Sequence, residues 1–206
     1  SGDVKRIDPD GTVSIYCDRA GDTPIAVANY PVFDAAGNLY VSDSGGWLEN
    51  SGLICKIAPG GEGEVWSRDL AEFPNGTAID AAGEYLYVAM STDPGIARIK
   101  INDDGSAGAA EMLVALPSTV PDGLAFDTEG TIYCSCYRPD RIYQYTAAGR
   151  LDVLADDYAG TAIAAPTNVA FCGPERDLFL SANLGRWHIS KYDLGKIGMP
   201  LNYPEV

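Results

Sequence analysis

The stretch from Val120 to Gly130, VPDGLAFDTEG, decides the fold because the chain repeats its outline three more times. It occurs as FPNGTAIDAAG at residues 73–83, and in weaker form as ANYPVFDAAG at 28–37 and APTNVAFCGP at 165–174. Aligned on Phe33, Ile79, Phe126 and Phe171, the copies lie 46, 47 and 45 residues apart. A constant period in this range is typical of a solenoid, a propeller or an array of repeats.

The content of each repeat selects among these architectures. A short apolar run leads into a turn such as DAAGN or DTEGT, followed by a β-rich run: LYVSD, YLYVAM, IYCSCY or LFLSAN. An alternating strand comes next, for example GLICKIAP or GIARIKIN, and the first three repeats close with GEVWSRDL, AEMLVAL and RLDVLAD. No window carries a convincing helical pattern. Four short strands in about 45 residues predict an all-β chain made of β-propeller blades.

The repeats predict a single propeller domain over residues 1–206. A partial blade at about 1–25 precedes blades at about 26–71, 72–118, 119–163 and 164–206. Residues 4–17 resemble the two outer strands of a blade without its inner strands, and the last repeat has no evident outer strand. The chain thus supplies about four and a half four-stranded blades. Either the ring is unusually small, or part of it lies on a missing segment or another chain; we favour the second.

A polar residue recurs just before each apolar run: Asn29, Asn75, Asp122 and Asn168. The first strand of a propeller blade lines the central channel, so these side chains are expected to converge at one mouth. Carboxylate and amide oxygens suit calcium, magnesium or manganese and do not suit a Cys/His zinc site. Asn and Asp also form turns, but four copies in register favour a shared site.

Composition narrows the partners and the location. The 206 residues are 46% hydrophobic and 21% charged, with a net charge of −15, which argues against nucleic acid and anionic membrane surfaces. No apolar run of about 18 residues and no signal peptide is visible. Five scattered cysteines predict reduced thiols and a cytoplasmic setting. Cys134 and Cys136 share one strand face, and packing is favoured over a redox or metal pair.

The phrases FPNGTAIDAAGEYLYVAMST, VPDGLAFDTEGTIYCSCYRPDRIYQYTAAGRL and APTNVAFCGPERDLFLSAN resemble the senescence-marker-protein/gluconolactonase family, which includes regucalcin-like lactonases. The resemblance covers nearly the whole chain. It implies a six-bladed propeller with one divalent cation at the channel mouth, calcium first, with magnesium, manganese and zinc left open. The family's Pro-Asn-Gly and Pro-Asp-Gly metal ligands match Asn75 and Asp122. A further Asn that binds substrate or metal matches Asn29, but Tyr30 follows where the family has Asp, which bears on substrate choice.

A second departure concerns the N-terminal side. The family's metal-binding Glu, from its first blade, has no counterpart before Asp3. Six blades of about 46 residues need about 276 residues, about 70 more than the chain has. The resemblance therefore implies an open ring and an incomplete metal site, and a complementary chain with the first blades would complete both.

The resemblance implies hydrolysis of lactones or related esters. The cation would polarise the carbonyl and water would attack, with Asp122 as metal ligand and general base. Asn29, Tyr30 and Asn168 at the mouth are the predicted contacts to a small-molecule substrate. Arg138 and Arg186, in loops after second strands, are further candidates, although the sequence leaves open which mouth those loops cover. The alternatives are a non-catalytic propeller acting as a ligand-binding or protein-interaction module, and a propeller enzyme of different chemistry.

Overall fold

The computed structural model describes residues 2–203, and every regular element in that range is a β-strand. Four successive sheets form the blades, and we number the blades in chain order. The first blade has strands β5 (Ala28–Phe33), β6 (Leu39–Asp43), β7 (Leu53–Ile57) and β8 (Gly63–Ser67). The second has β9 (Pro74–Ile79), β10 (Tyr85–Met90), β11 (Gly95–Ile101) and β12 (Ala107–Ala115).

The third and fourth blades follow the same order. The third blade has β13 (Val120–Phe126), β14 (Ile132–Arg138), β15 (Arg141–Tyr145) and β16 (Leu151–Asp156); the fourth has β17 (Pro166–Cys172), β18 (Leu178–Asn183) and β19 (His188–Tyr192). Within each blade, every strand pairs antiparallel with the next along the chain, as short hairpin connections require. The all-β prediction and the outer strand in the first three repeats are confirmed, and up to residue 203 the fourth repeat has three strands, as expected.

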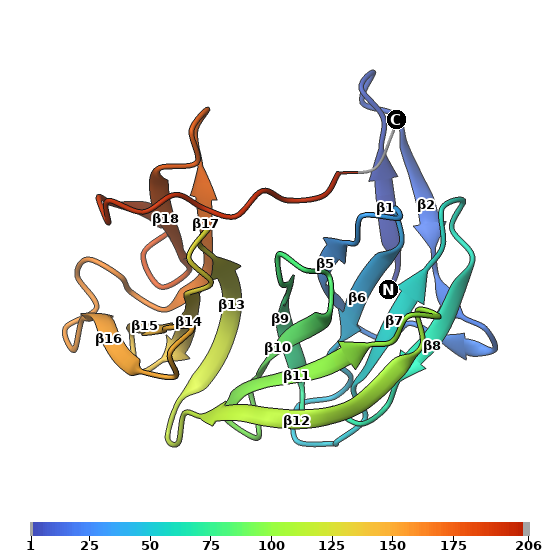
Figure 1. The fold of residues 1–206 in the computed structure, drawn as a ribbon, viewed down its shortest axis with the longest axis horizontal. Coiled ribbons are helices and arrows are strands. Elements are labelled where there is room, and N and C mark those ends of the chain that lie inside the picture. Colours follow the sequence, from blue (N-terminus) through green and yellow to red (C-terminus); the bar gives the residue numbers. More distant parts are fainter. Residues whose placement is uncertain (1, 204–206) are drawn as a thin grey trace.

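The sheets fan around a common axis with β5, β9, β13 and β17 innermost, which makes the fold a β-propeller (Figure 1). The hydrophobic cores lie between neighbouring sheets. Tyr40 and Trp66 of the first blade pack with Leu86 of the second, and Tyr87 packs with Phe126 of the third. Each such buried side chain contributes about 1.5–3 kcal/mol. A blade therefore depends on its neighbours for stability.

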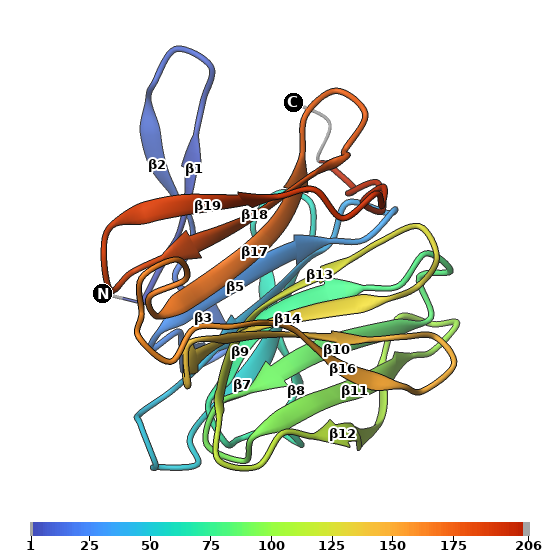
Figure 2. The same cartoon turned by 90° about the vertical axis from the view of Figure 1, so that its left-hand side faces the viewer.

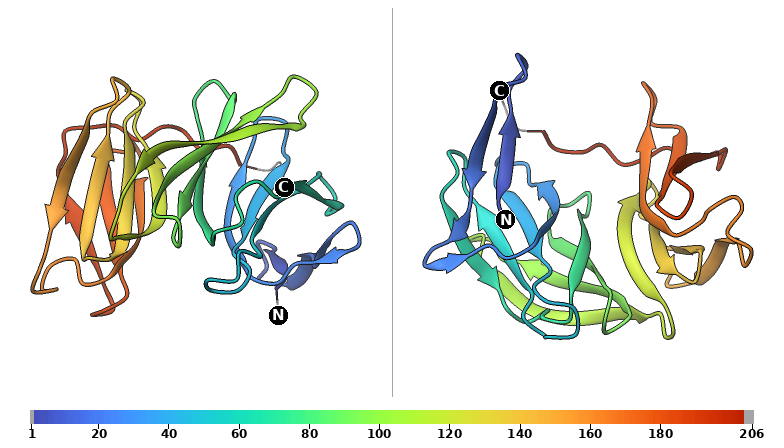
Figure 3. Two further views of the ribbon diagram at one scale, coloured as in Figure 1. Left: turned by 90° about the horizontal axis from the view of Figure 1, so that it is seen from below. Right: turned by 180° about the vertical axis from the view of Figure 1, so that it is seen from behind.

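The N-terminal segment forms two hairpins, β1 (Val4–Ile7) with β2 (Val13–Cys17) and β3 (Arg19–Ala20) with β4 (Thr23–Pro24). The first hairpin supplies two strands within residues 4–17 and projects beyond the blades (Figure 2), and their assignment to the outer part of a further blade stays a prediction. The second hairpin was not predicted. Figure 3 shows the ring open between these hairpins and the fourth blade, with the C-terminal segment crossing the opening. The number of blades in a closed ring stays a prediction.

The crossing segment is attached at both ends. The Thr128 N–H donates to the Ile197 carbonyl, and the Met199 N–H donates to the Phe126 carbonyl. Across the opening, Asn202 Nδ2 donates to the Phe33 carbonyl at 3.1 Å. The segment from Met199 to Tyr203 thereby covers an apolar part of the channel with a volume of about 560 Å³. Within the described range no helix could cross a membrane.

Candidate functional site

Close packing of the inner strands explains the Pro-Asn-Gly and Pro-Asp-Gly phrases. A Cβ added at Gly76 would lie 2.3 Å from the Asp122 carbonyl oxygen, and one at Gly123 would lie 2.7 Å from Asn168 Oδ1. Glycine after the polar residue therefore lets the next inner strand approach. As a result Asn75, Asp122 and Asn168 lie on directly adjacent strands, at the same end of the channel.

Asn75 and Asp122 line one pocket of about 350 Å³. Its walls are mainly aromatic and apolar, and Trp47 and Phe73 contact each other edge to face with ring centroids 4.9 Å apart. The full lining is Trp47, Phe73, Asn75, Ser91, Val120, Asp122, Tyr137 and Arg138. Trp47 and Ser91 come from segments that follow second strands, and Arg138 is the last residue of the second strand β14. Those loops therefore cover the same mouth as the polar residues, which the sequence left open.

The carboxyl group of Asp122 is partly desolvated by burial. Burial raises its pKa to about 7, and a hydrogen bond with the Asn75 side chain lowers it by a smaller amount. A carboxyl group with a pKa near neutrality can both give and take a proton at physiological pH. Perturbed acids of this kind are concentrated at functional sites.

Asn75 supplies the second polar group. Asn75 is only 6% exposed. Its Nδ2 donates to Ser91 Oγ at 3.3 Å, and its Oδ1 is buried with no hydrogen-bond partner among residues 2–203. A buried amide oxygen without a partner is costly unless a ligand uses it. With the neighbouring Asp122 carboxylate it forms a pair of hard oxygen donors. These residues fit a divalent cation.

Tyr30 and Asn168 meet across the channel. The Tyr30 hydroxyl of β5 donates to Asn168 Oδ1 of β17 at 3.1 Å, although 138 residues separate them in sequence. Burial raises the pKa of Tyr30, the hydrogen bond to Asn168 lowers it, and the charge of Asp122 raises it further. The phenol is thus electrostatically coupled to Asp122. Of the four residues expected to converge, Asn75, Asp122 and Asn168 lie at this end of the channel, and Tyr30 lies with them through its contact to Asn168.

Asn29 is placed differently. Its side chain is exposed and donates from Nδ2 to Ser44 Oγ at 2.9 Å. It does not line the pocket with Asn75 and Asp122. Its predicted part in metal or substrate binding stays a prediction.

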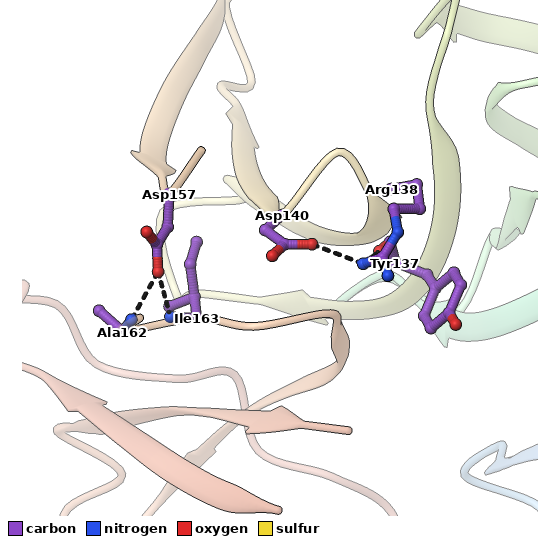
Figure 4. A network of polar contacts seen from close by, with 6 residues as sticks. All are labelled: Tyr137, Arg138, Asp140, Asp157, Ala162 and Ile163. Atoms are coloured by element: carbon purple, nitrogen blue, oxygen red, sulfur yellow. Dashed lines mark hydrogen bonds and ion pairs between the residues drawn. The ribbon is translucent and has the colours of Figure 1, made fainter. Parts of the chain in front are cut away.

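The two candidate arginines also differ in whether they line this pocket. Arg138 lines the pocket, donates to Asp140 Oδ1 at 2.8 Å and stacks on Tyr137 with the guanidinium 4.8 Å from the ring centroid (Figure 4). Arg186 is exposed on the β18–β19 turn and does not line that pocket. Its neighbour Trp187 is 88% exposed. The structure thus brings one of the two predicted arginines to the site.

Sequence reasoning missed Ser91, Phe73 and Tyr137. The available signal was Ser91 itself, which directly follows a second strand as Ser44 does 47 residues earlier. Among residues 2–203 no three His, Cys, Asp or Glu side chains cluster as a metal site. The predicted ligands, one carboxylate with amide oxygens, do not belong to such clusters. Cys134 and Cys136 are both fully buried in the core, and neither is disulfide-bonded.

A family profile described as the SMP-30/Gluconolactonase/LRE-like region matches residues 1–183. The chain belongs to this family. Similar solved structures include a luciferin-regenerating enzyme, at 15% identity and a TM-score of 0.79 over 100% of this chain and 76% of the enzyme. A gluconolactonase from Xanthomonas campestris shares 17% identity and a TM-score of 0.75, over 93% of this chain and 66% of that one.

A third similar structure is regucalcin from Agrobacterium tumefaciens, described as a calcium-binding protein. It shares 20% identity and a TM-score of 0.67, over 84% of this chain and 58% of its own length. At these identities the SMP-30/gluconolactonase relatives establish the fold, and this chain spans only part of each. No curated protein sequence matches the chain significantly.

Proposed function

We propose that this chain is a divalent-cation-dependent hydrolase of lactones or related esters. The observation that carries the proposal is the buried, unpartnered Asn75 Oδ1 beside the Asp122 carboxyl group in a pocket open to solvent. Membership of the SMP-30/gluconolactonase family supports it. The regucalcin relative makes calcium the first cation to test, with magnesium, manganese and zinc next.

Asn75 and Asp122 would hold the cation. When bound, such an ion supplies Lewis acidity toward a carbonyl oxygen. Asp122 takes the proton of the attacking water as the water oxygen bonds to the acyl carbon. The same carboxyl group returns the proton to the alcohol oxygen as the acyl C–O bond breaks. Asp122 therefore ends each turnover in its starting state.

The other lining residues select and place the substrate. Trp47 and Phe73 offer apolar ring faces that exclude water from one side of the pocket. Arg138 lines the pocket and is ion-paired with Asp140, and its guanidinium would favour a substrate with an anionic substituent. Tyr30 and Asn168 form a polar bridge across the channel and would contact the far side of the substrate.

The test compares hydrolysis of a lactone panel in calcium and in EDTA. We expect activity in calcium that Asp122→Ala lowers at least about 1,000-fold. Asp80→Ala, which removes a turn carboxylate on the second blade, is the matched control and should keep activity. Full activity of Asp122→Ala, or equal activity in EDTA, would contradict the proposal.

A specific observation favours the second candidate, a non-catalytic ligand-binding propeller. Among residues 2–203, Asp122 is the one carboxylate that lines the pocket. Calcium binding without hydrolysis of any lactone would select this alternative. The predicted complementary chain would lie in the opening beside β19, and native mass spectrometry of the purified protein tests for it.

A further inference from the structure

A hydrogen-bond relay joins the second blade to the third behind the pocket. Asn75 Nδ2 donates to Ser91 Oγ at 3.3 Å, and Ser91 Oγ donates to the Pro121 carbonyl oxygen at 2.7 Å. Ser91 is 2% exposed, so water does not replace these contacts. Pro121 directly precedes Asp122. The relay therefore connects the two candidate cation ligands through one serine hydroxyl.

The relay has one permitted direction. A carbonyl oxygen can only accept, so the single hydroxyl proton of Ser91 must go to Pro121. The Ser91 oxygen is then left as an acceptor, and only the nitrogen end of the Asn75 amide can face it. The oxygen end is consequently left without a protein partner. Ser91 thus keeps the nitrogen end of the Asn75 amide turned inward, in the same sense as the hydrogen bond of Asn75 with the Asp122 carboxylate, and the oxygen end remains available to a ligand.

The first blade contains the same arrangement without the pocket. Asn29 Nδ2 donates to Ser44 Oγ at 2.9 Å, and Ser44 Oγ donates to the Pro74 carbonyl at 2.8 Å. Ser44, like Ser91, is buried and directly follows a second strand. Because Asn29 lies outside the pocket, Ser44 orients an amide that is not a pocket residue. Its carbonyl partner Pro74 directly precedes Asn75, so Ser44→Ala also controls for the loss of a backbone contact next to a candidate ligand.

The third blade has no serine at the position equivalent to Ser91, and its polar residue does not need to be oriented by one. Pro74 pairs with Met90 and Pro121 pairs with Cys136, so Tyr137 occupies the place of Ser91. The polar residue of that blade is Asp122, whose two carboxylate oxygens are equivalent. An amide has a donor end and an acceptor end, and only an amide needs to be oriented.

We propose that Ser91 is the positioning residue of the cation site, holding the Asn75 amide with its oxygen available to a divalent ion. This inference rests on the proposed function. Mutation of a group that hydrogen-bonds to a metal ligand and orients it commonly lowers metal affinity by about 10- to 100-fold. Ser91→Ala removes the serine contact that orients the amide and leaves only its hydrogen bond with Asp122, and an N–H directed at the ion position opposes binding.

The first measurement needs no metal. In ¹⁵N–¹H NMR spectra of the 206-residue chain, Asn75→Asp assigns the Asn75 side-chain amide signals by removing them. We expect Ser91→Ala to shift these signals and speed their exchange with water, while Ser44→Ala leaves them in place. Unchanged Asn75 signals in Ser91→Ala would overturn the relay.

The second measurement is calcium affinity by titration calorimetry on the same proteins. We expect Ser91→Ala to weaken binding about 10- to 100-fold, Ser91→Thr to restore most of it, and Ser44→Ala to change it less than about twofold. In an Asn75→Ala background, Ser91→Ala should add no further loss, because no amide remains to be oriented.

The outcomes separate the two proposals. If the wild-type chain binds calcium and Ser91→Ala binds it equally well, the positioning role is wrong and the proposed function stands. Equal losses in Ser44→Ala and Ser91→Ala would also overturn it, because both changes would then act through general stability. If the wild-type chain binds no calcium, the proposed function fails and the positioning role fails with it.

Discussion

Strands β9 and β17 occupy the same position in their repeats but differ in their surroundings. Every residue of β9 is buried, whereas β17 is largely half-buried and carries an exposed Ala170. β9 lies between the first and third blades, while β17 has the third blade on one side and the opening on the other (Figure 1). The repeated phrase specifies where a polar side chain points. The neighbouring blades decide whether it is desolvated.

The two amides of these strands show the consequence. Asn75 on β9 is buried with a free oxygen, whereas Asn168 on β17 accepts hydrogen bonds from Tyr30 and from the Val169 N–H. Only the first has an oxygen available without breaking a protein contact. The closed side of the ring therefore carries the stronger candidate ligand.

The largest difference is expected between Asn75→Ala and Asn168→Ala. Asn75→Ala removes a proposed ligand and should lower calcium-dependent kcat/KM at least about 100-fold. Asn168→Ala removes one partner of Tyr30, and the loss should stay below about tenfold. Calcium affinity and lactone kinetics on both variants check this. Equal losses would mean that both amides hold the cation.

The next difference concerns stability. Leu86 and Leu178 both lie on second strands, of the second and fourth blades, but Leu86 is fully buried and Leu178 only partly. Leu86→Ala should lower the free energy of unfolding by about 2–5 kcal/mol, and Leu178→Ala by about 1 kcal/mol. Urea unfolding followed by far-UV circular dichroism measures both. Similar costs would show that the opening is filled in solution.

Two acids, Asp122 and Asp157, should make the free energy of unfolding depend on pH in opposite directions. Burial raises the pKa of Asp122 to about 7, so the calcium-free folded state retains a proton that the unfolded state loses above about pH 4. Its stabilising contribution is present below about pH 4 and is lost as pH rises to about 7. Asp122→Asn should remove this decline. The measurement is the free energy of unfolding of the variant and of the wild type at pH 5 and at pH 8, and the difference between the two proteins should change between these pH values.

Asp157, in the exposed loop before the fourth blade, should act in the opposite sense. Backbone hydrogen bonds from Ile163 and Ala162 lower its pKa, so its stabilising contribution is present above the usual Asp pKa and is lost as pH falls (Figure 4). Asp157→Asn should therefore reduce stability at pH 6 with little change at pH 3. A loss of the same size at both pH values would contradict this assignment.

The smallest difference is expected between the arginines. Arg138→Ala should raise KM for an anionic lactone about three- to tenfold at low ionic strength, with kcat less affected. Arg186→Ala, on the exposed turn of the fourth blade, should change KM less than about twofold. A larger effect of Arg186 would show that the fourth blade takes part in binding.

The repeat made the architecture predictable, because a 45- to 47-residue period with glycine- and proline-bounded strands fits few folds. It also placed Asn75 and Asp122 together, since equivalent positions on adjacent inner strands must be neighbours. The hydrogen-bond partners were not predictable. Whether Asn168 is free depends on Tyr30, a residue 138 positions away on a strand that meets β17 only in the folded ring.

The contact between Asn202 and Phe33 has a consequence for how the chain folds. These residues are 169 positions apart, so their hydrogen bond closes a very long loop of polypeptide. Closing a loop of that length costs chain entropy that a local hairpin does not, and slow steps in folding commonly involve such distant pairs. The first blade is synthesised long before its C-terminal contact exists. We therefore expect the crossing segment to dock last, after the blades have stacked.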